Sequence, residues 1–293
     1  MHALVLIAAL SNPFILQSNF WLNLHHFLRA AGRGMPIERT MTAEDRKVWD
    51  EVVSTYKSKW STRDVLFDDG MVKINDALSV AREHAPDVPG EPELKPALEK
   101  AAPIYRKYWW PAHDARNRSW IGGVQPLLAR YVPALTNKLA ASYGKTWPSK
   151  PIVVDVSVQA GPVGAFTTWP PHSTIASTDP GYLGLASLEI LIHESSHQWA
   201  TILMESIARA AKAHNKKVPR QLWHAVLFYN AGELTRRAYF DDGIDDYTEI
   251  AVKLYPVLCG EGCRDRVAAA WTPHLDGKAT IDEAIDKLVG EWP

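Results

Sequence analysis

The sequence predicts an α+β protein, because one short segment with strand signals is embedded in a chain that otherwise has helical spacing of its apolar residues. The strand signals lie within residues 151–177, and amphipathic helices are expected on both sides of them. With 293 residues, 46% hydrophobic and 22% charged, the chain can bury a sizeable core. We expect a mainly helical part over residues 1–148, packed on a second part over residues 149–293.

Apolar residues recur at helical spacing in several stretches of the first half. We expect helices over residues 19–31, from Thr42 onward, over 97–108 and over 123–143. Thr42 with Asp45 resembles a capping box at the start of the second helix. Residues 84–96 contain four prolines and therefore predict a surface loop.

The second half begins with strands and continues with helices. A strand is expected over residues 152–158, where apolar side chains occupy every second position. Two more short strands are expected over residues 165–168 and 173–177. They are followed by a helix expected from about 185 to 215 and another from Pro219 to about Tyr239. Proline suits the first position of a helix, where its missing N–H costs nothing.

One motif is specific enough to suggest chemistry. Residues 193–197 read His-Glu-Ser-Ser-His and match H-E-x-x-H on an expected helix. Residues four apart lie on one helix face, so His193 and His197 can reach the same tetrahedral zinc ion, with Glu194 beside them as general base. The motif therefore predicts one zinc ion per chain and hydrolysis, and the alternative is a set of polar groups on a solvated helix face.

In its context of strands, a glycine-bounded turn and two helices, the motif resembles that of the zincin metallopeptidases. The resemblance covers roughly residues 150–240, about a third of the chain, and only the motif itself is sharply specific. The metzincin extension needs glycine and histidine where this chain has Ala200 and Leu203. The resemblance is therefore to the gluzincin branch. It implies a zincin-like core after residue 148, a glutamate on the following helix as third ligand, and peptide bonds as substrate.

Two side chains on that following helix compete as third zinc ligand. If a straight helix carries His197 about 20 residues before an antiparallel turn, this residue lies about 30 Å from the turn. Glu233 then returns about 24 Å and His224 only about 10 Å, so Glu233 is the expected ligand. His224 comes into range if the first helix ends early. The other interpretation of Glu233 is a salt bridge with Arg236 or Arg237.

The expected mechanism gives each group a role. Zinc lowers the pKa of its bound water, and Glu194 takes the proton. A second donor to the oxyanion is expected from His224 or Tyr229, for which a packing role in the core is the alternative. The resemblance also implies that the strand before the motif lines the substrate cleft, with His172 and Thr174 at its border. An ordinary edge strand with a solvated histidine is the alternative there.

The predicted function is that of a zinc-dependent hydrolase, and the resemblance makes it a metallopeptidase acting on a peptide or protein. The alternative is a non-catalytic binding protein that retains the same scaffold. Loss of Glu194 or of a motif histidine would favour that alternative, and all three residues are present. The net charge of −1 offers no electrostatic reason to expect a nucleic-acid partner.

Two features bear on location. The strongly apolar first ten residues are interpreted either as a short signal-peptide core, which lacks its usual positive charges, or as a buried first element. Cys259 and Cys263 enclose two glycines and are expected either as a small disulfide loop or as two free thiols. Together they slightly favour a periplasmic or secreted protein over a cytoplasmic one. No apolar run reaches the roughly 20 residues needed for an integral membrane segment.

Overall fold

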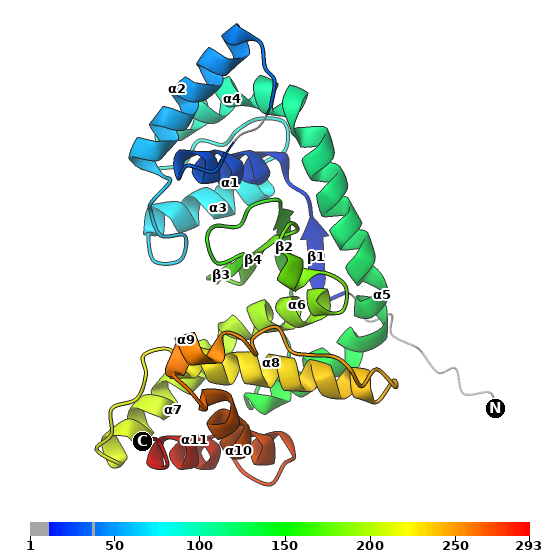
Figure 1. The fold of residues 1–293 in the computed structure, drawn as a ribbon, viewed down its shortest axis with the longest axis vertical. Coiled ribbons are helices and arrows are strands. Elements are labelled where there is room, and N and C mark those ends of the chain that lie inside the picture. The colour runs from blue at the N-terminus through cyan, green and yellow to red at the C-terminus, as the bar shows by residue number, and fades with distance from the viewer. Residues whose placement is uncertain (1–11, 37–38) are drawn as a thin grey trace, which may run out of the picture.

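The computed structural model describes residues 12–36 and 39–293 and shows a small sheet with helices above, beside and below it (Figure 1). The strands are β1 (Phe14–Gln17), β2 (Ile152–Ser157), β3 (Ala165–Thr168) and β4 (His172–Ala176). The α-helices are α1 (Phe20–Gly32), α2 (Ala43–Lys59), α3 (Asp69–Val80), α4 (Leu94–Tyr108), α5 (Trp110–Ser142), α6 (Ala186–Ser196), α7 (Ala200–Ala213), α8 (Leu222–Phe240), α9 (Tyr255–Cys259), α10 (Cys263–Leu275) and α11 (Ile281–Gly290). Two short 3₁₀ helices are η1 (Pro180–Tyr182) and η2 (His197–Trp199). This mixture confirms the α+β class.

The four strands form one sheet in the order β1-β2-β4-β3. β1, β2 and β4 are parallel, whereas β3 is antiparallel to β4 and forms an edge. The register pairs Asp155 with Thr174 and Thr167 with Ser173. Strand β1 was not predicted, because four residues are too short a run to show strand alternation and its pairing partner is distant in sequence.

The helices expected in the first half are present, and capping side chains set where several of them begin. Asn19 accepts hydrogen bonds from two backbone N–H groups at the start of α1, and Thr42 accepts one from Asp45 at the start of α2. Helix α3 was not expected and follows a third cap, Asp68. Helix α5 begins earlier than predicted and runs along the side of the sheet (Figure 1).

The motif helix ends much earlier than predicted. α6 stops at Ser196, the 3₁₀ turn η2 covers the next three residues, and α7 begins at Ala200. Because a 3₁₀ turn has fewer residues per turn, it breaks the straight register between the two helices. No glycine or proline marks this break, so the sequence showed one uninterrupted helical period. Pro219 lies in the loop before α8 rather than at its first position.

The buried apolar residues form two main cores. One contains residues of α1–α4, and the larger one combines the sheet with α5, α6, α8, α10 and α11. Phe14 of β1 and Leu135 of α5 belong to the larger core, together with Val154 and Leu188. The larger core therefore includes elements from both sides of residue 148, and the division of the chain at that residue stays a prediction.

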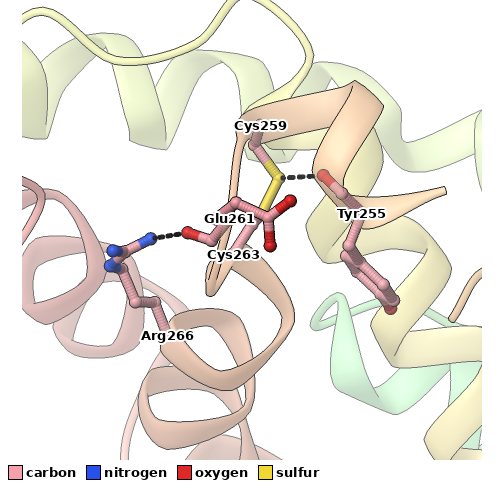
Figure 2. The surroundings of a disulfide bond; sticks show 5 residues. All are labelled: Tyr255, Cys259, Glu261, Cys263 and Arg266. Carbon is pink, nitrogen blue, oxygen red and sulfur yellow. Dashed lines mark hydrogen bonds between the residues drawn. A yellow bond between two sulfur atoms is a disulfide. The ribbon is translucent and has the colours of Figure 1, made fainter. Parts of the chain in front are cut away.

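The two cysteines are bonded to one another. Figure 2 shows the Cys259–Cys263 disulfide joining the end of α9 to the start of α10. Arg266 donates a 2.8 Å hydrogen bond to the backbone oxygen of Glu261 in the loop between them. Of the two interpretations of this pair, the disulfide loop is the one found.

The apolar first ten residues lie outside the described part of the chain, and within that part no helix has the length and apolar character to cross a bilayer.

Candidate metal centre

Three histidines from two helices bring their rings together. His193 and His197 lie one turn apart where α6 ends, and His224 lies in the first turn of α8. The Nε2 atom of His193 is 3.3 Å from Nε2 of His197 and 3.3 Å from Nε2 of His224. One ligand atom from each residue lies within 4.8 Å of the other two, and no other trio of acidic, histidine or cysteine side chains in residues 12–36 and 39–293 does so. This group could hold a metal ion.

Partial or full removal from water favours the neutral form of all three imidazoles. It lowers the pKa of His193 well below its usual value, with a smaller contribution from the two neighbouring histidines. Burial, and then the proximity of His224, lowers the pKa of His197 to about 3, and burial lowers the pKa of His224 to about 4. A neutral imidazole offers a nitrogen lone pair, which is the form that binds metals.

Aromatic side chains of α8 hold the imidazole planes. Phe228 stacks on the ring of His193 with the centroids 3.6 Å apart, and Trp223 stacks on the ring of His224 at 4.8 Å. Within the described residues, Nδ1 of His193 has no hydrogen-bond partner, so packing rather than a carboxylate orients this ring. Neither Trp223 nor Phe228 was predicted as a site residue. Trp223 comes one residue before His224 and Phe228 four residues after it, and this spacing was the signal in the sequence that could have identified them.

The carboxylate of Glu194 is buried between α6 and the edge strand β3. Its side chain is only 3% exposed, and α6 packs against both β3 and α8, lying between the sheet and α8 (Figure 1). Burial raises the pKa of Glu194 to about 7, although a hydrogen bond from Thr167 opposes the shift. The Thr167 hydroxyl donates that bond to Oε2 over 2.7 Å. Thr167 was predicted as part of a strand but not as a site residue.

The structure does not bring Glu233 to the three histidines. Arg236 donates to Oε2 of Glu233 over 2.8 Å, and Arg237 donates to Oε1 over 2.7 Å, as the salt-bridge interpretation requires. The helix break explains the difference. The distances that favoured Glu233 assumed a straight helix through His197, whereas α6 ends there, so α8 meets the histidines with its first turn and presents His224.

Tyr229, His172 and Thr174 also lie away from the histidine group. The Tyr229 hydroxyl is hydrogen-bonded to Thr272 over 2.8 Å, which supports its packing role rather than its role as oxyanion donor. His172 is neither at the border of the histidine group nor a solvated residue of an edge strand. It belongs to the inner strand β4 and is bonded to Asp155 over 2.8 Å. Side chains alternate between the faces of a strand, so His172 and Thr174 lie on the opposite face from Ser173.

The structure therefore groups His193 and His197 with His224 and leaves Glu233 and Tyr229 elsewhere. The carboxylate of Glu194, which follows His193 on α6, is bonded to Thr167. Comparison of the chain with protein-family models, with curated proteins and with solved structures finds no match. Function is accordingly inferred from the chemistry of this group.

Proposed function

We propose that the chain is a zinc-dependent hydrolase in which His193, His197 and His224 hold the ion. The observation that carries the proposal is the pair of 3.3 Å contacts made by one atom, Nε2 of His193. A neutral imidazole nitrogen either donates one hydrogen bond or accepts one, so it cannot satisfy two neighbouring ring nitrogens. Nitrogens bound tetrahedrally to zinc at about 2.0 Å stand about 3.3 Å from one another, which fits the contacts.

The three imidazole ligands favour zinc over hard cations that prefer oxygen ligands. Three imidazoles suit zinc and related transition metals, whereas calcium and magnesium take mainly carboxylate, carbonyl and water oxygens. Catalytic zinc sites commonly use three protein ligands and keep a fourth position open. His197 and His224 are only partly buried, so solvent reaches the group from their side. These features support a catalytic rather than a closed structural site.

The chain supplies a proton acceptor beside the ion. A bound zinc ion would supply a water of lowered pKa and would polarise a substrate carbonyl. Thr167 holds Oε2 of Glu194, whereas no residue in the described part of the chain donates a hydrogen bond to Oε1. Oε1 is therefore the atom left to take a proton from the attacking water and return it to the leaving group.

The proposed substrate is a peptide bond, on the strength of the motif's resemblance to the zincin metallopeptidases. Strand β3 supports this choice, because it forms the edge of the sheet and carries Thr167 beside Glu194. An extended peptide added to that edge would pass close to the carboxylate. A histidine as third ligand departs from the gluzincin pattern, so we propose a zincin-like site without assigning the branch. The disulfide suits a periplasmic or secreted location.

Replacing Glu194 with glutamine tests the proposal. We expect wild-type protein purified without added zinc to contain about one zinc ion per chain and to cleave an unfolded protein substrate. Glu194→Gln should keep the ion and lose at least about a hundred-fold in kcat, because general-base catalysis contributes about 10²- to 10⁴-fold. Glu205→Gln makes the same chemical change at an exposed position of α7 and should leave kcat unchanged.

Three outcomes would count against parts of this proposal. Wild-type protein that neither contains nor takes up zinc would remove the metal site. Full activity of Glu194→Gln would remove the carboxylate from its role. Wild-type protein that holds zinc but cleaves no peptide in a broad library would favour the non-catalytic binding protein instead.

A further inference from the structure

Two hydroxyl groups form a chain of hydrogen bonds that ends on the carboxylate of Glu194. The Oγ1 atom of Thr167 is 2.7 Å from Oε2 of Glu194, 3.1 Å from the backbone oxygen of Glu194 and 2.9 Å from Oγ of Ser173. Ser173 is 1% exposed and Glu194 is 3% exposed. Hydrogen bonds shielded from water in this way are electrostatically stronger than those at the surface.

Counting protons fixes the direction of these bonds. The Thr167 hydroxyl has one proton and two possible acceptors on Glu194. The backbone oxygen of Glu194 already accepts from the N–H of His197 where α6 ends. When Glu194 is ionised, as a proton acceptor must be, its carboxylate is also the stronger acceptor, so Thr167 donates to Oε2. The hydroxyl of Ser173 has no other hydrogen-bond partner among the described residues, so its proton goes to Oγ1 of Thr167. The chain runs from Ser173 through Thr167 to the carboxylate.

The sheet places both hydroxyls in register. Thr167 and Ser173 are direct cross-strand partners on β3 and β4, so the pleat points both toward the face that α6 covers. We propose that this hydroxyl pair positions Glu194: it fixes Oε2 and leaves Oε1 to exchange a proton with the reacting water. Thr167 acts as a positioning residue rather than a catalytic one. The inference rests on the proposed role of Glu194 as general base.

Thr167→Val tests this inference in the zinc-loaded, full-length protein. Valine keeps the shape of threonine and removes the donor. We expect zinc content to stay at about one ion per chain, KM to stay within about two-fold, and kcat to fall about ten- to hundred-fold, as expected for a misplaced catalytic group. Thr167→Ser, which restores the donor, should recover kcat to within about three-fold of wild type.

Two further variants bracket the effect. Ser173→Ala removes the more distant hydroxyl and should lower kcat only about two- to five-fold, because Thr167 still donates to the carboxylate. Thr168→Val is the matched control, since Thr168 neighbours Thr167 on β3 and points to the other face, where its hydroxyl makes a 3.4 Å contact with the backbone of His172. It should leave kcat unchanged. A full kcat in Thr167→Val, or an equal loss in Thr168→Val, would overturn the inference.

A second readout does not depend on activity. Crystal structures of zinc-loaded wild-type and Thr167→Val proteins should differ at Glu194, with Oε2 bonded to Thr167 in the wild type and the carboxylate turned or spread over two positions in the variant. An unchanged carboxylate would overturn the inference. If wild-type protein hydrolyses nothing, the proposed function fails, and these two structures still decide whether Thr167 positions Glu194.

Discussion

His197 and His172 lie on opposite faces of the sheet and differ in charge state. On the face covered by α6, burial meets no acceptor, and the pKa of His197 falls to about 3. On the other face, burial again lowers the pKa of His172, but hydrogen bonds to Asp155 and Asp76 outweigh it and raise the pKa to about 9. Burial alone therefore does not identify a metal ligand. The neighbouring carboxylates decide whether an imidazole keeps its lone pair or carries a charge.

Two clusters of side chains lie on the two faces: His172 with Asp155 and Asp76 on one, and His193, His197 and His224 on the other. They also differ in the elements that they hold together. Asp155 is fully buried and accepts hydrogen bonds from His172 over 2.8 Å and from Ser79 over 2.6 Å, so it ties α3 to β2 and β4. The three histidines on the other face make no hydrogen bond to a carboxylate within the described residues. The cluster around His172 is thus held by hydrogen bonds to carboxylates, although Oδ1 of Asp155 has no partner among the described residues. The three histidines have no such carboxylate, and they could hold a metal ion.

The sharpest test of this contrast is removal of a histidine from each face. His224→Ala should lose zinc almost completely, because losing one of three ligands should cost more than the 10- to 100-fold seen for indirect partners of a metal. His172→Gln should bind zinc with wild-type affinity. Titration with zinc against a competing chelator measures both. Near-normal affinity in His224→Ala would mean that another side chain is the third ligand.

The charged histidine predicts a loss of stability at high pH. The pKa of His172 is raised in the folded protein to about 9, above about 6.5 in the unfolded chain. Its contribution is therefore fully present below about pH 6.5 and is lost as the pH rises through 9, a change of at most about 3 kcal/mol. Urea unfolding at pH 7 and pH 10 should show this loss in wild type and not in His172→Gln. Equal pH dependence would show that His172 is neutral in the fold.

The smallest expected effect concerns Glu233. Because its carboxylate is bonded to Arg236 and Arg237 rather than placed with the histidines, Glu233→Gln should bind zinc within about two-fold of wild type. The free energy of unfolding should fall by about 1 kcal/mol, since both arginines are partly exposed and solvent screens the pair. A large loss of zinc would instead restore Glu233 as a ligand and contradict the grouping with His224.

The predictable part of the site was the part encoded by local spacing. His193 and His197 are four residues apart on one helix, so their common face follows from helix geometry alone. His224 depends on where α6 ends, and neither a glycine nor a proline announces that break. The contact of Thr167 with Glu194 joins a strand to a helix, and it depends on how the two pack rather than on any pattern along the chain.

The same division holds for the fold. The strand β2 and the helices α1 and α2 were predictable, because alternation and capping residues are written in consecutive positions. Strand β1 was not, since its pairing with β2 supplies most of what defines it as a strand. The charge of His172 was equally hidden, because its two aspartates come from α3 and β2.

Strand β4 gives consecutive residues to the two clusters. His172 belongs to the ion pair on one face and Ser173 to the hydroxyl chain on the other. A slip of β4 by one residue in its pairing with β2 and β3 would exchange the faces of every side chain in the strand. Such a change would carry the imidazole toward Glu194 and the hydroxyl toward Asp155. The register that β2 and β3 impose on β4 is therefore what keeps the ion pair and the hydroxyl chain on separate faces.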